Sequence, residues 1–269
     1  MNRRKSDIWQ GSHTVDIPIS LLAFLSQEQH SMGIEGSIGE IGVHGGLFFI
    51  GLAHLAASTE KLWACDVFDQ QEKNVDGSRN GNLNYFLQAC GRFGIQREKI
   101  KLFIGSSAEL SVDYSKKELF PLFRIFSVDG GHTRELTFND LSFAASNLVD
   151  GGIIVLDDVT NFEAWPGVID GMFTWFSLYP LEFGPFFVGH NKVFITSASH
   201  HGLYYDKILN HPVWSKYISV DPDSNQNPMK DKRSGSNSFS WGGFKYLKLT
   251  EEPPHRVIYN EWLAAMNLS

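Results

Sequence analysis

The sequence has few cysteines, no excess of positive charge and no long hydrophobic run. Its 269 residues include only Cys65 and Cys90, which excludes a disulfide framework and a thiolate zinc site. Lys and Arg number 23 against 30 Asp and Glu, a net charge of −7, so we expect no broad surface for nucleic acid. The longest apolar stretches, Ile17–Leu25 and Gly45–Ser58, are too short to cross a bilayer, so we expect no membrane partner.

The start of the chain also lacks the pattern of a secretory signal, because its basic residues run into polar sequence instead of an apolar core. With so few cysteines, the composition suits the reducing cytoplasm. What the sequence does have is 42% hydrophobic and 13% aromatic residues, which is ample material for a packed core.

Short β-rich runs alternate with longer amphipathic stretches, which predicts a parallel sheet with helices on both faces. The expected strands are Ser37–Val43, Leu62–Phe68, Lys101–Gly105, Arg124–Asp129 and Ile153–Asp157. The expected helices are Gly46–Ser58, Asn80–Phe93, Ala108–Leu119, Arg134–Leu148 and Val168–Leu178. Two last runs, Pro185–Val188 and Lys192–Thr196, are joined by three residues, which requires an antiparallel hairpin. The prediction is a doubly wound, Rossmann-like α/β fold with a seven-stranded sheet whose last strand is antiparallel.

Three regions are expected along the chain. Residues 1–35 form a helical cap that contains a helix over Ile17–Gln29, residues 36–198 form the core, and residues 199–269 form a C-terminal extension. Within the extension, Asp221–Gly243 is rich in polar residues and glycine and reads as a flap or a surface loop. In such a sheet the ligand lies at the carboxyl ends of the strands, so the functional residues should follow each strand.

The first strand ends in a glycine-rich turn that is a poor match to the dinucleotide fingerprint, because His44 occupies the middle glycine position. Glu40, on the strand itself, favours a ligand that carries an amino group and hydroxyls. Asp66, at the end of the second strand, is placed to accept hydrogen bonds from a ribose diol. Ser106 and Ser107 form a small polar turn suited to an adenine edge. The alternative is that these are ordinary turns with solvated acids.

Together these turns resemble class I S-adenosylmethionine-dependent methyltransferases, and in particular the small-molecule O-methyltransferases of the macrocin and aminocoumarin-sugar type. The resemblance covers roughly Ser37 to Ser197 and rests on Glu40-x-Gly42-x-x-x-Gly46, Asp66, Gly105-Ser106-Ser107, Val128-Asp129-Gly130-Gly131-His132 and Leu156-Asp157-Asp158. It implies a cofactor site in which Glu40, Gly42 and Gly46 surround the methionine part, Asp66 the ribose, and Ser106 and Ser107 the adenine. His44 and Asp129 are expected to belong to the same cofactor site.

Three carboxylates, Asp129, Asp157 and Asp158, follow the fourth and fifth strands, which are neighbours in a parallel sheet. Clustered carboxylates repel one another unless a cation or a proton joins them, and such ligands suit Mg²⁺. The resemblance implies that these three residues hold the metal; the alternative is that only Asp129 lines the site. His132 is the expected general base, or else it caps the next helix or helps to hold the metal.

The predicted function is transfer of a methyl group to a hydroxyl of a small molecule, such as a sugar or another secondary metabolite. The alternatives are a nicotinamide-dependent oxidoreductase and a module that binds the cofactor without turnover. Trp165 is expected either to stack on the acceptor or to anchor the packing. His190, His200 and His201 are expected to be loop histidines, and the aromatic stretch from Phe173 to Phe187 to pack into the core or to form the interface of a homo-oligomer.

Overall fold

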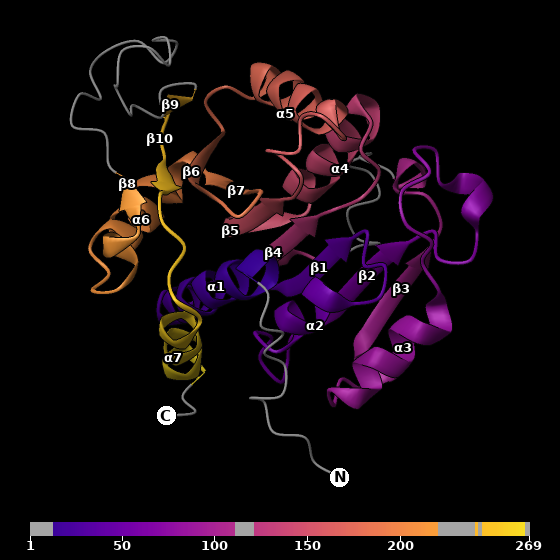
Figure 1. Cartoon of the computed structure of the whole chain (residues 1–269), viewed down its shortest axis with the longest axis horizontal. Helices are drawn as coiled ribbons and strands as arrows, with labels where there is room; N and C mark the ends of the chain where they lie inside the picture. The colour runs from indigo at the N-terminus through magenta and orange to yellow at the C-terminus, as the bar shows by residue number, and fades with distance from the viewer. Residues whose placement is uncertain (1–12, 111–120, 220–239, 242–243, 267–269) are drawn as a thin grey trace.

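A mixed sheet forms the centre of the molecule. The computed structural model describes residues 13–110, 121–219, 240–241 and 244–266. Over these residues the main sheet has nine strands in the order β3-β2-β1-β4-β5-β7-β6-β11-β8 (Figure 1). Their bounds are β1 Ser37–Ile41, β2 Leu62–Asp66, β3 Ile100–Ile104, β4 Phe123–Val128, β5 Leu148–Leu156, β6 Phe183–Gly189, β7 Lys192–Ser197, β8 Ile218–Ser219 and β11 Leu247–Leu249. A separate short pair joins β9 Ser240–Trp241 to β10 Phe244–Lys245.

Helices cover both faces of the sheet (Figure 1). On one face α4 and α5 share an apolar cluster with the sheet, and on the other α1, α2, α3, α6 and α7 share a second cluster. Their bounds are α1 His13–Ser31, α2 Leu47–Ala53, α3 Leu83–Arg92, α4 Arg134–Ser146, α5 Pro166–Leu178, α6 Ala198–Leu209 and α7 His255–Ala265. The central strands β1 and β4 are buried along their whole length, although Glu40, Arg124 and Ser127 interrupt their apolar sequences.

The predicted fold class is confirmed. Strands β1 to β5 pair in parallel, and β7 runs antiparallel to both β5 and β6. Beyond the seven strands expected, β11 pairs with β6 and β8 pairs with β11, so the C-terminal region extends the sheet. Where a helix over Ala108–Leu119 was expected, the structure has a 3₁₀ turn, Ser107–Glu109, that ends at Leu110; residues 111–119 lie outside the described residues. Most of the expected flap, Asp221–Gly243, also lies outside them.

The two ends of the described chain pack together. Ser20 Oγ in α1 donates to the Ile258 carbonyl in α7 at 3.0 Å, and both helices contribute to the same apolar cluster. His200 and His201 were expected in a loop, but both lie in α6, where His201 Nε2 is 2.9 Å from the Pro185 carbonyl. No helix among the residues described has the length and apolar character needed to span a bilayer.

A buried ion pair fixes the end of the sheet remote from the carboxyl edge. Arg124, at the start of β4, is fully buried, and its guanidinium contacts Glu60 at 2.6 and 2.9 Å. The same group donates to Ser26 and Gln29 of α1 and to the Leu55 carbonyl. Each donor of this charge therefore has a partner, as a charge in the interior requires.

Candidate active site

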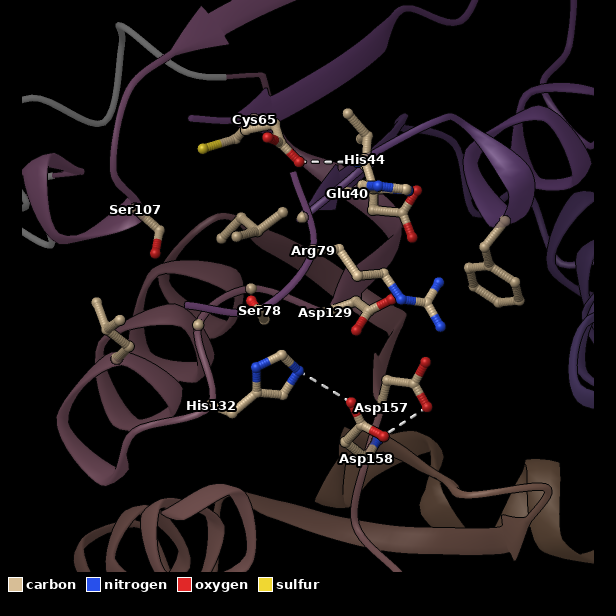
Figure 2. A pocket seen from close by; sticks show the side chains of 18 of the residues that line it. Glu40, His44, Cys65, Ser78, Arg79, Ser107, Asp129, His132, Asp157 and Asp158 are labelled. Carbon is tan, nitrogen blue, oxygen red and sulfur yellow. Dashed lines mark hydrogen bonds and ion pairs between the residues drawn. The ribbon is translucent and has the colours of Figure 1, made fainter. Parts of the chain in front are cut away.

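A cavity of about 460 Å³ opens at the carboxyl ends of the strands, where the winding of the sheet reverses between β1 and β4. All of the predicted site residues except Gly46 line it. Figure 2 shows the predicted cofactor residues Glu40, His44 and Ser107 around the same cavity as Asp129, His132, Asp157 and Asp158. The structure thus brings the two predicted sets of residues into one site.

The turn after β1 requires its glycines. Gly42 has φ 84°, and a Cβ atom there would lie 1.7 Å from the carbonyl oxygen of Asp129, so no other residue fits. The backbone of β1 also meets β4 here, because the Asp129 amide donates to the Ile41 carbonyl at 3.0 Å. Gly46, with φ 86°, is the residue before α2 and closes the turn by donating to the Val43 carbonyl at 2.7 Å. Gly46 therefore supports the turn that lines the cavity without lining the cavity itself.

Glu40 places a buried carboxyl group in the cavity. The residue is 1% exposed, and its Oε1 accepts a hydrogen bond from Ser127 Oγ at 3.0 Å. Its Oε2 makes no hydrogen bond within the described part of the chain. Burial raises the pKa of Glu40 to about 8, against the opposing influence of Lys192. A ligand that brings an ammonium group to Oε2 would satisfy this oxygen and favour its charged form.

Asp66 joins the first two turns of the sheet. Its Oδ2 accepts the His44 amide hydrogen at 2.8 Å and its Oδ1 accepts that of Phe68 at 2.6 Å. His44 and Phe68 both have φ 45°, so the carboxylate stabilises two left-handed turn residues. Each carboxylate oxygen accepts more than one hydrogen bond, and Asp66 also lines the cavity. Asp66 can therefore hold the turns and accept from a ligand hydroxyl.

The turn after β3 contacts a buried acid that the sequence analysis did not identify. Ser106 Oγ accepts the Ala108 amide hydrogen at 3.2 Å, whereas Ser107 Oγ donates to Asp140 Oδ2 at 3.1 Å. Asp140 lies in α4 and is fully buried, which raises its pKa to about 7. Gly130 makes room for it, since a Cβ atom there would lie 2.5 Å from Asp140 Oδ2. An acidic residue on the apolar face of the expected helix was the sequence feature that could have identified Asp140.

His132 lies between two carboxylates. Its Nδ1 is 2.8 Å from Asp76 Oδ2 and its Nε2 is 3.0 Å from Asp158 Oδ2, while its amide donates to the same Asp76 oxygen at 2.6 Å. Burial lowers the pKa of His132, but the hydrogen bonds to Asp158 and Asp76 outweigh it and the net shift is upward. The indole of Trp165 stacks on the imidazole at 4.1 Å between ring centroids. The helix cap is Thr133, whose Oγ1 accepts the Leu136 amide hydrogen, so His132 is not needed for capping.

Asp76 was also missed by the sequence analysis, because it lies in the irregular segment between β2 and α3. Its neighbours Lys73, Asn74, Val75 and Ser78 line the cavity. Hydrogen bonds from Ser78 and His132 outweigh its partial burial and lower the pKa of Asp76 to about 2. Asp76 is therefore an anion near neutral pH, held against His132.

Of the three predicted metal ligands, Asp129 and Asp158 lie close to His132, whereas Asp157 does not belong to that group. Asp129, His132 and Asp158 each offer an atom within 4.8 Å of the other two. Burial and repulsion by Asp157 raise the pKa of Asp129. Burial also acts to raise the pKa of Asp158, but hydrogen bonds from His132 and Asn191 outweigh it and the net shift is downward. Carboxylate oxygens crowded in this way suit a divalent cation such as Mg²⁺.

Asp157, in contrast, is engaged by a lysine. Its Oδ1 accepts the Asp158 amide hydrogen at 2.8 Å, and its Oδ2 forms an ion pair with Lys192 Nζ. Lys192 begins β7 and is 2% exposed, with its ammonium 4.4 Å from the centroid of the Phe48 ring. Burial opposes its charge, but Asp157 and Asp129 outweigh that effect and raise the pKa of Lys192.

The β6–β7 hairpin therefore holds both members of the aspartate pair. Lys192 contacts Asp157, and Asn191 Nδ2 donates to Asp158 Oδ1 at 2.6 Å. The hairpin register was the signal for this: Leu156 pairs with Val193, which brings Asp157 opposite Lys192. In the sequence, Lys192 stands out as a charged residue directly before the apolar residues of the last expected strand.

The comparisons with known proteins agree with the fold. Residues 40–159 match the model of a methyltransferase domain family. The solved structure of the O-methyltransferase NovP has a TM-score of 0.54 and 12% identity, over 67% of this chain and 79% of that one. Two further solved structures, both of methyltransferases, have lower TM-scores of 0.47.

One of these is CalS11, a TDP-rhamnose 3'-O-methyltransferase of calicheamicin biosynthesis, at 18% identity over 65% of this chain and 78% of that one. The other is TomG from Streptomyces achromogenes, involved in tomaymycin synthesis, at 15% identity over 67% and 77%. A search of curated protein sequences returned no significant relative. The family match favours the methyltransferase prediction over the oxidoreductase alternative. Residues 40–159 are therefore similar to a methyltransferase domain, and the fold of the chain is Rossmann-like.

Proposed function

We propose that this protein transfers the methyl group of S-adenosylmethionine to a hydroxyl group of a small molecule. One observation carries the proposal: groups suited to the cofactor and an acid–base cluster share a single cavity at the switch point of a methyltransferase fold. Methyl transfer from a sulfonium needs the acceptor oxygen in line with the methyl carbon, together with a group that takes the hydroxyl proton. The cavity supplies residues for both tasks.

The cofactor half is assigned to the turns after β1, β2 and β3. Glu40 Oε2, which is buried and lacks a hydrogen bond within the described chain, would accept the α-ammonium of the methionine part. Asp66 would accept from the ribose hydroxyls, and the turn of Ser106 and Ser107 would face the adenine. Gly42 and Gly46 keep side chains out of this path, and the amide of His44 is held in place by Asp66.

The acceptor half is assigned to the turns after β4 and β5. Once the acceptor hydroxyl takes the place of Asp158 at Nε2, His132 would accept its proton there, with Asp76 at Nδ1 keeping the ring in position. S-adenosylmethionine, when bound, would supply the methyl group for the acceptor oxygen and leave as S-adenosylhomocysteine. Trp165, stacked on the imidazole, fixes the plane of the ring.

A divalent cation fits this site. The ligand atoms would be carboxylate oxygens that follow neighbouring strands. The three aspartates of this part of the cavity exceed the single buried lysine there, Lys192, in number of charges. Asp129 and Asp158 would hold the cation beside His132, and the sequence resemblance adds Asp157. A bound Mg²⁺ would lower the pKa of the acceptor hydroxyl.

The acceptor is proposed to be a small molecule, of the sugar or secondary-metabolite class. The cavity of about 460 Å³ must hold both the reacting part of the acceptor and the cofactor, which limits the size of the acceptor. The net charge of −7 disfavours nucleic acid as the acceptor.

The test is calorimetric titration of the purified protein with S-adenosylhomocysteine, in Mg²⁺ and again in a chelator. Binding at one site per chain is expected, and no binding in either buffer would contradict the proposal. In an acceptor screen, Asp158→Asn should abolish methyl transfer but retain S-adenosylhomocysteine binding, because Asp158 belongs to the acceptor half. Full activity of the wild-type protein in excess chelator would remove the metal from the mechanism.

A further inference from the structure

Lys192 is a buried cation that the proposed reaction does not use. Its neighbours in β7, Val193, Phe194 and Ile195, are all buried apolar residues that fill the core. A lysine ammonium at such a position costs free energy unless anions compensate it. The compensation comes chiefly from the ion pair with Asp157, and the ring of Phe48 also lies beside the ammonium.

The ion pair with Lys192 leaves Asp157 with little capacity for a metal. One oxygen accepts the Asp158 amide hydrogen and the other contacts the ammonium. A metal ion would have to displace Lys192 or share an oxygen with it, at a distance where two cations repel strongly. Asp129 and Asp158 face His132 instead, and these three residues are the group whose ligand atoms converge within 4.8 Å.

We propose that Lys192 is a positioning residue. Its ion pair with Asp157 keeps that carboxylate from binding a metal, so a divalent cation in this cavity is bound by Asp129 and Asp158 and not by Asp157. This inference rests on the proposed function only in assuming a divalent cation in the same cavity. Asn191 and Lys192 then have complementary tasks. The amide of Asn191 orients Asp158 toward the cation, while Lys192 turns Asp157 away from it.

The test uses Mn²⁺ alone as the probe, titrated into the full-length protein and followed by calorimetry and by its electron paramagnetic resonance signal. Asp158→Asn should weaken Mn²⁺ binding about tenfold or more, whereas Asp157→Asn should change it less than about threefold. Lys192→Met, of similar length but uncharged, should tighten binding about tenfold because Asp157 is released as a ligand. That gain should vanish in the Lys192→Met/Asp157→Asn double variant.

The double variant also guards against misfolding. Asp157→Asn alone leaves a buried ammonium without its partner and is expected to be destabilised, whereas removing both charges together is tolerated more easily. If the single variant does not fold, the double variant takes its place and should bind Mn²⁺ within about threefold of the wild-type protein.

Three results would overturn the inference: an equal loss of Mn²⁺ affinity in the Asp157 and Asp158 variants, a gain in Lys192→Met that persists without Asp157, and no Mn²⁺ binding by the wild-type protein. S-adenosylhomocysteine binding is measured on the same samples. If it is absent while the Mn²⁺ pattern holds, the proposed function fails and the role of Lys192 stands. If it is present while the Mn²⁺ pattern fails, only the role of Lys192 is lost.

Discussion

The buried carboxyl group of Glu40 should make the protein less stable as the pH rises. Its pKa is raised from 4.5 to about 8 because the group is removed from water. The folded state therefore binds the proton more tightly than the unfolded state does. Stability is greatest below the unfolded pKa and falls as the pH rises from about 4.5 to about 8, by about 1.4 kcal/mol per pH unit for this one group.

Glu40→Gln keeps the size and the hydrogen-bonding shape of the side chain but has no proton to lose. At pH 7 it should stabilise the protein without ligand by about 3 kcal/mol, the product of that slope and the pH interval above the unfolded pKa. Between about pH 5.5 and pH 7.5 its advantage over the wild-type protein should widen by about 3 kcal/mol. All other ionisable groups are common to both proteins, so their contributions largely cancel.

The measurement is urea unfolding of both proteins across this pH range, read by circular dichroism. Ser127→Ala is the matched control, since it removes the hydrogen bond to Oε1 but leaves the carboxyl group, and so should keep the pH dependence. A stability difference that does not change with pH would refute the reasoning. The same Glu40→Gln protein should bind S-adenosylhomocysteine more weakly, because the proposed partner of its ammonium is gone.

Three further predictions concern other parts of the site and fold. Asp76→Asn should lower kcat about tenfold or more, by loosening the ring of His132, and leave S-adenosylhomocysteine affinity nearly unchanged; equal kcat would contradict this. Gly42→Ala should cost about 3 kcal/mol or more of stability, because its Cβ atom meets backbone, whereas Gly91→Ala, with open space at its Cβ, should be neutral or stabilising by up to about 1 kcal/mol in thermal melts. Arg124→Met should lose about 3 to 5 kcal/mol in urea unfolding, since it strands a buried carboxylate; a loss below about 1 kcal/mol would show that the ion pair is dispensable.

The layout of the core was predictable because its signals are local. Apolar runs, glycine turns and the short hairpin each mark an element within a few residues, and parallel connectivity then places the strand ends at one edge. The C-terminal additions were not predictable in the same way. Strands β8 and β11 are two and three residues long, and they exist only because the edge of β6 is open to receive them.

The candidate site was predictable only where a residue directly follows a strand. Asp76 reaches His132 from an irregular segment 56 positions earlier, and Asp140 reaches Ser107 from the next helix, 33 positions later. No periodicity records such contacts, because they depend on how a loop crosses the sheet edge. Lys192 is an intermediate case, since the hairpin register implied its position but not its burial.

The segment between β2 and α3 forms part of the cavity wall and also carries Asp76, whose carboxylate contacts both the backbone and the ring of His132. If this wall swings out to exchange spent cofactor for fresh, it must break that contact. Cofactor exchange and the release of His132 from Asp76 would then be coupled in one movement. The protein would then hold an aligned base only while the wall is closed.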